Sequence, residues 1–341
     1  MDIEGLGIIL EPTAREFENQ AVLNPACLLL NGTTHLYYRA VHRGNFSTIG
    51  YCQLRDGRVT KRLDHPLLEP EYHYESHGLE DPRLVVLDGV YYLFYTAFDG
   101  ENVHTAYATG TDPLHFEKQG VISPSLPYEE ALRLLPPKES LEKYRRYGKH
   151  YEEVKDPGVF LWEKDTLIFP KKINGRFMLL ARIMPGIQII PFDYFADLKL
   201  SFWKGFLGEL DRHMLLQPAY WFETRKIGTG CPPLETPAGW LLIYHAVQET
   251  PAGNVYRAAA ALLDLADPTR VIARLPEPLF EPDASWEKQG DTANVVFPTG
   301  ATLDGDELII YYGAADTRIA AKRLSLAELL AELKRHPYGQ A

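Results

Sequence analysis

Short apolar and aromatic runs, each introduced by a turn sequence, recur along the whole chain. In five of them an Asn-Gly, Asp-Gly or Ala-Gly pair precedes an aromatic or β-branched run. The five copies are NGTTHLYYRA (31–40), DGVYYLFYTA (88–97), NGRFMLLAR (174–182), AGWLLIYHA (238–246) and DGDELIIYYGA (304–314). Such pairs form hairpin turns, and the runs behind them are typical of strands. The pattern predicts an all-β protein.

Further strand-like segments flank each copy. A run with a proline precedes it, and another apolar run follows it, as in STIGYCQL (47–54). The preceding runs are NPACLLL (24–30), EDPRLVVL (80–87), FPKK (169–172), GCPPLET (230–236) and NVVFPTGATL (294–303). A unit of three or four strands repeated five times is the pattern of a propeller. We therefore expect one five-bladed β-propeller domain over residues 1–341.

Two segments depart from the strand pattern. Residues 123–154 are polar at their centre with helical character, which predicts a helical insertion between blades 2 and 3. Residues 325–336 begin with Ser325, followed three positions later by Glu328, a capping-box pattern. Their leucines at 326, 329, 330 and 333 share one face, which predicts a C-terminal helix. Either segment is a candidate subunit contact in a homo-oligomer.

Composition and charge exclude several classes of protein. Hydrophobic residues make up 45% and charged residues 24%, as in globular proteins. The net charge of -11 argues against a nucleic-acid partner. Three widely separated cysteines fit reduced thiols rather than a disulfide set, and no metal-ligand spacing occurs. Without a signal-like start or a membrane-length apolar run, we expect a cytoplasmic protein with no membrane partner.

Acidic residues beside the repeated prolines are candidates for chemistry, because the inner strands of a propeller converge on one axis. Glu80, Asp81 and Arg83 surround Pro82, which restricts the preceding Asp81 to an extended conformation. They form either a strand-end salt bridge or an acid tuned to protonate a glycosidic oxygen. Asp156, also before a proline, is either a turn residue or a sugar-hydroxyl acceptor.

Basic residues occupy equivalent places in several copies. Arg39, Arg182 and His245 end the second strand of three blades, and Lys172 lies near the same strand of the third. Each alone fits ordinary surface solvation, but together they would bind a tetrahedral anion. In the last blade, Tyr312 and Asp316 flank a small-residue turn, and Asp316 either caps that turn or binds a hydroxyl.

These motifs together resemble glycoside hydrolase family 130. The resemblance rests on EDPRLVVL, FPKKINGRFMLLARI, KIGTGCPPLETPAGWLLIYHAV, YRAAAALLDLADPTRVIAR, NVVFPTG and YYGAADT, and runs from about Asn24 to Asp316. That family contains β-mannoside phosphorylases and some β-mannosidases on a five-bladed propeller. The resemblance implies inverting phosphorolysis of a short β-1,2- or β-1,4-linked manno-oligosaccharide to mannose 1-phosphate.

The resemblance also implies roles for individual residues. Asp81 would be the general acid, relaying its proton through a mannose hydroxyl. Phosphate would be bound by Arg182, Lys172, His245 and Tyr312. Sugar contacts would come from Asn24, Arg39, Asp156 and Asp316, with Glu80 and Arg83 beside the acid. Inorganic phosphate would be a co-substrate, and neither a cofactor nor a metal is expected.

Two other functions remain open on the sequence. An inverting β-mannosidase on the same scaffold needs a second carboxylate to activate water, and Glu223 and Glu249 lie near suitable motifs. A non-catalytic propeller that binds a glycan would use Asp81 only structurally. Several candidate cations favour phosphorolysis, because phosphate is already a nucleophile and only has to be held in line.

Overall fold

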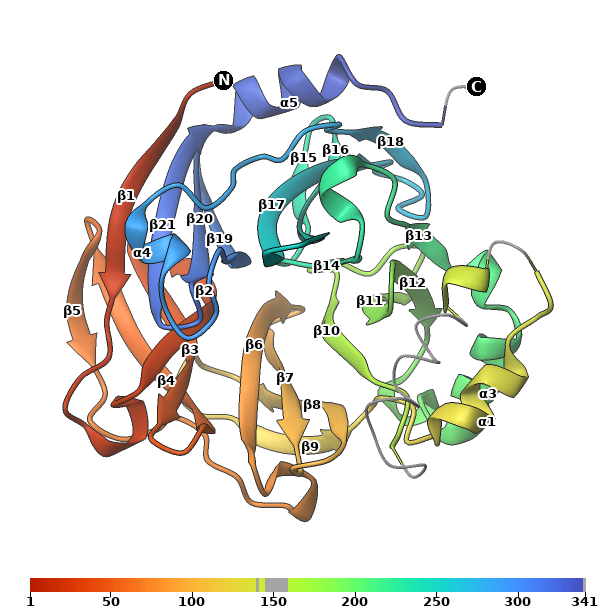
Figure 1. The fold of residues 1–341 in the computed structure, drawn as a ribbon, viewed down its shortest axis with the longest axis horizontal. Helices are drawn as coiled ribbons and strands as arrows, with labels where there is room; N and C mark the ends of the chain where they lie inside the picture. Colours follow the sequence, from red (N-terminus) through yellow and green to blue (C-terminus); the bar gives the residue numbers. More distant parts are fainter. Residues whose placement is uncertain (139–140, 145–158, 340–341) are drawn as a thin grey trace.

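The computed structural model of the chain describes residues 1–138, 141–144 and 159–339. Over these residues, strands form most of the regular structure, and Figure 1 shows them arranged around a common centre. The prediction of an all-β protein is confirmed.

Residues 21–121 form one eight-stranded sheet made of two antiparallel halves. The halves, which we call unit 1 and unit 2, are joined by a single parallel pair, Ser47 opposite Gly78. Unit 1 contains β2 (Ala21–Leu30), β3 (Thr33–His42), β4 (Phe46–Arg55) and β5 (Arg58–Arg62). Unit 2 contains β6 (Gly78–Leu87), β7 (Val90–Phe98), β8 (Val103–Gly110) and β9 (Glu117–Val121).

Three further antiparallel sheets complete the arrangement. Unit 3 contains β10 (Glu163–Ile168), β11 (Phe177–Ile183), β12 (Ile187–Phe192) and β13 (Met214–Leu216). Unit 4 contains β14 (Lys226–Thr229), β15 (Leu234–Thr236), β16 (Gly239–Thr250), β17 (Gly253–Leu263) and β18 (Val271–Arg274). Unit 5 contains β19 (Val296–Asp304), β20 (Glu307–Ala314), β21 (Arg318–Ser325) and β1 (Ile3–Leu10).

The five sequence copies form the second strand of the five units: β3, β7, β11, β16 and β20. The turns before three of them place Asn31, Asp88 and Asn174 at φ near +50°, which Asn and Asp tolerate better than other non-glycine residues. The predicted first strand of unit 3 is wrong, because β10 ends at Ile168 and residues 169–172 belong to the turn that leads into β11.

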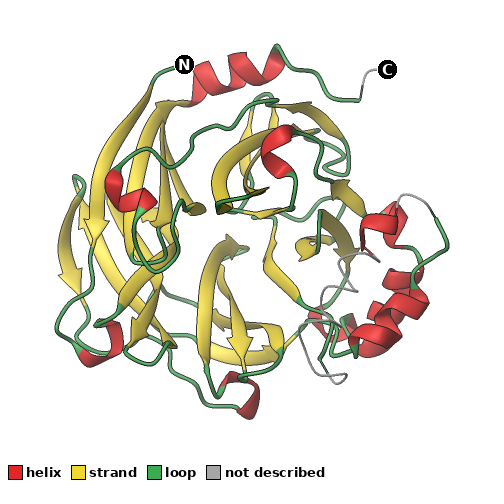
Figure 2. Ribbon diagram, viewed as in Figure 1, coloured by secondary structure: helices red, strands yellow, loops and turns green. Residues whose placement is uncertain are grey.

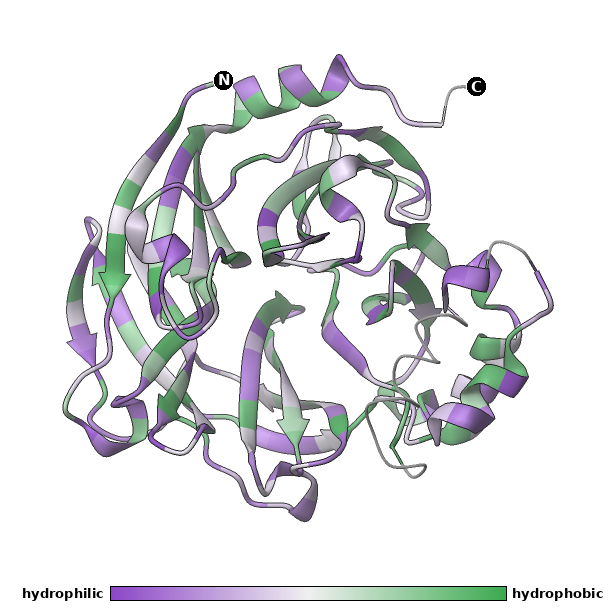
Figure 3. Cartoon of the chain, viewed as in Figure 1, coloured by the Kyte–Doolittle hydropathy of each residue, from purple (hydrophilic) through white to green (hydrophobic). Residues whose placement is uncertain are grey.

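Apolar side chains fill the spaces between neighbouring units. Tyr37 and Tyr51 of unit 1 pack in one cluster with Leu84 and Leu93 of unit 2. Another cluster joins units 1 and 5, and a third joins units 4 and 5. In Figure 3 the hydrophobic segments accordingly lie along the strands. Sheets packed face to face in this way leave strand ends and loops free to surround the centre.

Figure 2 shows the longer helices at the outer edge of the arrangement of strands. Helix α1 (Tyr128–Leu134) and helix α3 (Leu200–Gly208) contact each other beside unit 3, and α4 (Ser285–Lys288) precedes β19. Helix α1 lies in the predicted insertion 123–154, of which residues 139–140 and 145–154 fall outside the described residues. The short 3₁₀ turns are Glu16–Glu18, His73–Glu75, Phe195–Asp197, Leu210–Arg212 and Trp221–Glu223.

The C-terminal helix is confirmed as α5 (Leu326–Lys334). The hydroxyl of Ser325 accepts a hydrogen bond from the Glu328 N–H at 3.2 Å, so Ser325 is the N-cap residue. The four leucines of its predicted apolar face are all buried.

Candidate active site

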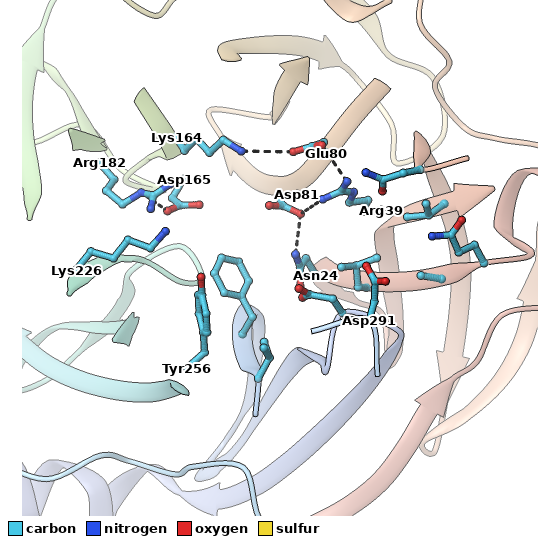
Figure 4. Close-up of a pocket in the computed structure, with 18 residues that line it drawn as sticks. Asn24, Arg39, Glu80, Asp81, Lys164, Asp165, Arg182, Lys226, Tyr256 and Asp291 are labelled. Carbon is cyan, nitrogen blue, oxygen red and sulfur yellow. Dashed lines mark hydrogen bonds and ion pairs between the residues drawn. The ribbon is translucent and has the colours of Figure 1, made fainter. Parts of the chain in front are cut away.

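A cavity of about 340 Å³ lies at the centre, where all five units contribute side chains (Figure 4). Its lining is strongly polar. The charged and hydrogen-bonding residues that line it include Asn24, Arg39, Glu80, Asp81, Lys164, Asp165, Arg182, Lys226, Tyr256, Asp291 and Asp316. Most of them come from first strands or from the ends of second strands, which explains how distant segments meet.

Three of these residues occupy the same kind of β-bulge. Asn24, Asp81 and Asp165 have φ of 48°, 49° and 57°, and each coincides with a register shift between the first and second strands of its unit. The prediction that Pro82 holds Asp81 in an extended conformation is therefore wrong. This left-handed conformation costs an ordinary side chain roughly 1–2 kcal/mol and is best tolerated by Asn and Asp. Bulges re-aim side chains, and here all three line the cavity.

The side of the cavity formed by units 1, 2 and 5 is rich in carboxylates; we call it the acidic wall. The Asn24 side-chain amide donates to Asp81 Oδ1 at 2.7 Å, and Arg39 Nη1 lies 3.8 Å from the same oxygen. Arg39 also donates to Glu80 at 2.9 Å, and Lys164 Nζ lies 3.5 Å from the other Glu80 oxygen. Burial opposes ionisation of Glu80, but these two cations outweigh it and hold its pKa below the ordinary value.

Two further carboxylates of the acidic wall, Asp291 and Asp316, come from unit 5 and the loop before it. Burial, reinforced by the nearby charge of Asp81, raises the pKa of Asp316 above its ordinary value. A wall with several carboxylates and amides suits sugar hydroxyls, which donate and accept hydrogen bonds.

The opposite side, formed by units 3 and 4, carries Arg182, Lys226 and the ring of Tyr256; we call it the basic wall. Figure 4 shows Arg182 and Lys226 across the cavity from Asp81. Burial, together with the Arg182 charge, lowers the pKa of Lys226 well below its ordinary value, so a bound anion would stabilise its charged form. Lys226 Nζ lies 5.9 Å from the centre of the Tyr256 ring.

Asp165 lies against the basic wall and is surrounded by basic side chains. Its carboxylate is 2.7 Å from Arg182 Nε, and 3.7 Å from both Arg83 and His245. Burial opposes its ionisation, but the charges of Arg182 and Arg83 hold its pKa at about 2. Burial also lowers the pKa of His245 to about 3, so its imidazole is neutral at physiological pH.

The structure brings most of the predicted site residues together. The cavity lining contains Asn24, Arg39, Glu80, Asp81, Arg182 and Asp316. Arg83 and His245 are buried next to it and contact Asp165. Arg83 also donates to the carbonyls of Gly230 and Thr229, which links units 2 and 4 beneath the cavity. Asp156 falls outside the described residues.

Two predicted phosphate ligands lie elsewhere, and their prediction needs correction. Lys172 is exposed in the turn before β11, with its Nζ 4.4 Å from the centre of the Phe177 ring rather than in the cavity. Tyr312 is fully buried, and its hydroxyl donates to Glu287 at 2.6 Å. The resemblance implied both roles, but Lys172 lies in the segment between β10 and β11, and the Tyr312 hydroxyl faces Glu287 of α4 (Ser285–Lys288).

Tyr312 belongs to a structural feature of units 1, 2, 4 and 5 that we call the glutamate clasp. In each, a buried glutamate accepts a hydrogen bond from a tyrosine of the second strand at 2.6–2.8 Å. In three of them Arg62, Lys118 or Arg274 also pairs with the glutamate. The pairs are Glu18 with Tyr38, Glu75 with Tyr95, Glu223 with Tyr244, and Glu287 with Tyr312.

The clasp removes one candidate water-activating base. Glu223 is fully buried, accepts backbone N–H groups from Ala219 and Tyr220, and pairs with Arg274 at 2.7 Å. Glu249 is mostly exposed on the β16 hairpin, 3.6 Å from Arg225. Neither glutamate lines the cavity.

Sequence reasoning missed Lys164, Asp165, Lys226, Tyr256 and Asp291, all of which line the cavity. Asp165 is the unit 3 counterpart of Asn24 and Asp81, but Thr166 replaces the expected proline. Asn24 precedes Arg39 in unit 1, and a similar spacing before Arg182 in unit 3 leads to a position close to Asp165. No comparable signal marked Lys226 or Tyr256.

Two features are absent from the described ranges. Residues 1–138, 141–144 and 159–339 contain no cluster of three or more His, Cys, Asp or Glu side chains that would hold a metal ion. No helix in these ranges is long and apolar enough to span a membrane.

Comparisons with known proteins agree on one family. The family model described as β-1,4-mannooligosaccharide phosphorylase, of glycoside hydrolase family 130, matches residues 10–335. A 1,2-β-oligomannan phosphorylase of Thermoanaerobacter sp. (strain X514) is 35% identical over 94% of this chain and 96% of its own. A β-1,2-mannobiose phosphorylase of the same strain is 35% identical over 91% of this chain and 92% of its own.

A solved structure shows the same fold. The β-1,2-mannobiose phosphorylase from Listeria innocua, in complex with β-1,2-mannobiose, superposes with a TM-score of 0.72 at 24% identity. The superposition covers 98% of this chain and 100% of that one. From the family model and the relatives over 30% identical, this chain belongs to glycoside hydrolase family 130.

Proposed function

We propose that this chain catalyses inverting phosphorolysis of a β-mannoside, with Asp81 as the general acid. The observation that carries the proposal is the division of the cavity: Asp81 lies on an acidic wall, opposite the cations Arg182 and Lys226. A sugar bound between the walls would have its leaving oxygen on the side of the acid and its anomeric carbon open to an anion on the other.

The reaction balances without a further reactant. The bond between the anomeric carbon and the glycosidic oxygen breaks, and a bond from that carbon to a phosphate oxygen forms on the opposite face. The proton of Asp81 passes through a mannose hydroxyl to the leaving oxygen, and solvent returns a proton to Asp81 after product release. The products are α-mannose 1-phosphate and the shortened acceptor.

Arg182, Lys226 and Tyr256 are the phosphate ligands that this geometry favours, in place of Lys172 and Tyr312. Arg182 offers a planar fork of donors and Lys226 a compact charge, which suit a tetrahedral anion. Arg83 and His245 would act beneath them by holding Asp165. Asn24, Arg39 and Asp316, on the opposite wall, remain the proposed sugar contacts.

Hydrolysis is less well supported by the carboxylates available. An inverting hydrolase needs a carboxylate base on the face opposite the acid. On that side the lining carboxylate is Asp165, and its pKa of about 2 makes it a weak base. Glu223 is bound in its clasp and Glu249 lies outside the cavity.

We further propose that the five units are the blades of one five-bladed propeller, forming a single catalytic domain. The shared superposition with a family 130 enzyme supports this architecture. The three buried free cysteines support a reducing, cytoplasmic location. Because both 35% identical relatives are named for β-1,2-linked substrates, we propose that linkage in preference to β-1,4.

The test is a panel of β-1,2- and β-1,4-linked mannobioses and longer oligosaccharides, incubated with and without phosphate. We expect mannose 1-phosphate from the β-1,2 series only when phosphate is present, and no change on adding EDTA. Free mannose at the same rate without phosphate would identify a hydrolase. Binding without turnover of any linkage would identify a glycan-binding protein.

A further inference from the structure

A buried carboxyl group behind the basic wall has no role in the reaction proposed above. Glu163 is the first residue of β10, is 1% exposed and lies two positions before Asp165. It does not line the cavity. Burying a carboxyl group is costly unless hydrogen bonds compensate, so its contacts indicate what it stabilises.

Glu163 is bound by two threonine hydroxyls from different units. The Thr105 hydroxyl, from β8 of unit 2, donates to Glu163 Oε2 at 2.6 Å. The Thr166 hydroxyl contacts Glu163 Oε1, and the two threonine oxygens are 3.2 Å apart. The three side chains form a closed buried network between units 2 and 3.

This network holds the bulge that aims Asp165. The strand register is regular at Glu163 and Lys164, shifts across Asp165 and Thr166, and resumes at Leu167. The Thr229 hydroxyl of unit 4 binds the Asp165 carbonyl from the other side. The bulge is therefore fixed by side chains from both neighbouring units, and its carboxylate lies 2.7 Å from Arg182 Nε.

We propose that Glu163 is a positioning residue for the phosphate site, which clamps the β10 bulge through Thr105 and Thr166 and thereby fixes Asp165 against Arg182. The proposal rests on the phosphorylase function above. A displaced bulge would leave Arg182 free to turn away from the anion, so the loss would fall on phosphate binding rather than on sugar binding.

The charge of Glu163 gives the proposal a distinctive pH dependence. Burial, strengthened by the Asp165 charge, raises the pKa of Glu163 to about 8. The charged groups that face it are Asp165 on its own strand and Arg182 on β11, while β8 contributes only the Thr105 hydroxyl. The neighbouring His104 directs its ring to Tyr74 and Phe160. Above pH 8, Glu163 would add a negative charge beside the phosphate site.

The experiment measures the phosphate KM and the mannoside KM from pH 6.5 to 9 in the wild type and in Glu163→Gln. Glutamine keeps the shape and stays neutral, so at pH 6.5 we expect phosphate KM values within about twofold of each other. At pH 9 we expect a phosphate KM about three- to tenfold higher in the wild type than in the variant, roughly 0.6–1.4 kcal/mol, with the mannoside KM unchanged.

Thr105 supplies a second variant that leaves the titrating group in place. Thr105→Val removes the hydroxyl at nearly constant volume, and we expect it to raise the phosphate KM about tenfold at pH 6.5. Thr105→Ser restores the hydroxyl and should restore the KM. The control is Glu75→Gln, a buried glutamate in the unit 2 clasp, which should lower stability without changing the phosphate KM.

Melting temperature gives a readout that does not depend on turnover. A carboxyl whose folded pKa is raised binds its proton more tightly in the folded state, so its contribution to stability is lost as pH rises from about 4.5 to 8. As the pH rises across this range, the melting temperature of Glu163→Gln should therefore increase relative to that of the wild type.

Two results distinguish a failure of the Glu163 role from a failure of the proposed phosphorolysis. A phosphate-dependent wild type whose pH profile overlies that of Glu163→Gln, with no effect of Thr105→Val, would overturn the role of Glu163 alone. A wild type that turns over equally without phosphate would overturn both.

Discussion

The two walls of the cavity occupy equivalent positions in the repeat but carry opposite chemistry. On the acidic wall, Asn24 donates a hydrogen bond to Asp81, and Arg39 donates one to Glu80. On the basic wall, Arg182 and Lys226 face a single carboxylate, Asp165. The repeat therefore supplies positions, whereas residue identity at each position decides whether a wall suits sugar hydroxyls or an anion.

The largest expected effect comes from the acidic wall. Asp81→Asn removes the proton donor but keeps an acceptor for Asn24, so we expect kcat to fall by about 10²–10⁴-fold. Steady-state kinetics on a β-1,2-mannobiose, with phosphate in excess, measure the loss.

An aryl mannoside with an acidic phenol sharpens this result, since its leaving group needs little protonation. Asp81→Asn should lose far less activity on that substrate than on mannobiose. Equal losses on both substrates would mean that Asp81 positions the sugar and does not act as the acid.

The basic wall should respond differently. Lys226→Ala removes a charged hydrogen-bond donor, worth about 1.5–3 kcal/mol, so we expect the phosphate KM to rise about 10- to 100-fold. The mannoside KM should change little. Lys172→Ala is the matched control, because that lysine is exposed and outside the cavity. An equal rise in both variants would contradict the assignment.

His245 links the basic wall to stability at low pH. Burial lowers the pKa of His245 to about 3 in the folded chain. Between about pH 6.5 and pH 3, His245 is therefore protonated in the unfolded chain but neutral in the folded chain. The stability from neutral His245 is complete above pH 6.5 and is lost as the pH falls toward 3. Urea midpoints at pH 7 and pH 4.5 should therefore differ less in His245→Gln than in the wild type; an equal or larger drop would exclude this cause.

The smallest effect on turnover is expected at the glutamates outside both walls. Glu223→Gln breaks a buried pair with Arg274 and should cost about 3–5 kcal/mol of stability, with kcat unchanged below the melting transition. Glu249→Gln should change neither quantity. If the wild type releases mannose without phosphate and either variant loses that release, the mutated glutamate is the base of a hydrolase.

The sequence predicted the acidic wall better than the basic wall, for a physical reason. Asn24 and Asp81 precede prolines, so these two residues were visible as a repeated pair, although the bulge that contains them was not predicted. In unit 3 the bulge at Asp165 has Thr166 in place of proline, and the Asp-Pro pair nearest to it in the sequence is at residue 156. Lys172 was implied by the resemblance, but it lies between β10 and β11 and outside the cavity.

Burial explains the other differences. Tyr244 and Tyr312 occupy equivalent positions on the second strands of units 4 and 5. Both side chains point away from the cavity and donate a hydrogen bond to a clasp glutamate. Sequence spacing does not reveal which face of a doubly covered strand a side chain occupies. Lys226 lies between Arg225 and Ile227, and Tyr256 lies between Val255 and Arg257, so nothing in the local pattern distinguished them.

The pairing of β1 with β21 has a consequence for biosynthesis. Ile3 lies opposite Leu324, 321 positions later, so β1 is synthesised long before the strand with which it pairs. Until β21 has been synthesised, residues 3–10 have no strand with which to pair and form a free apolar segment. A nascent chain that stalls late in translation would carry an unclosed edge, open to pairing with another such chain.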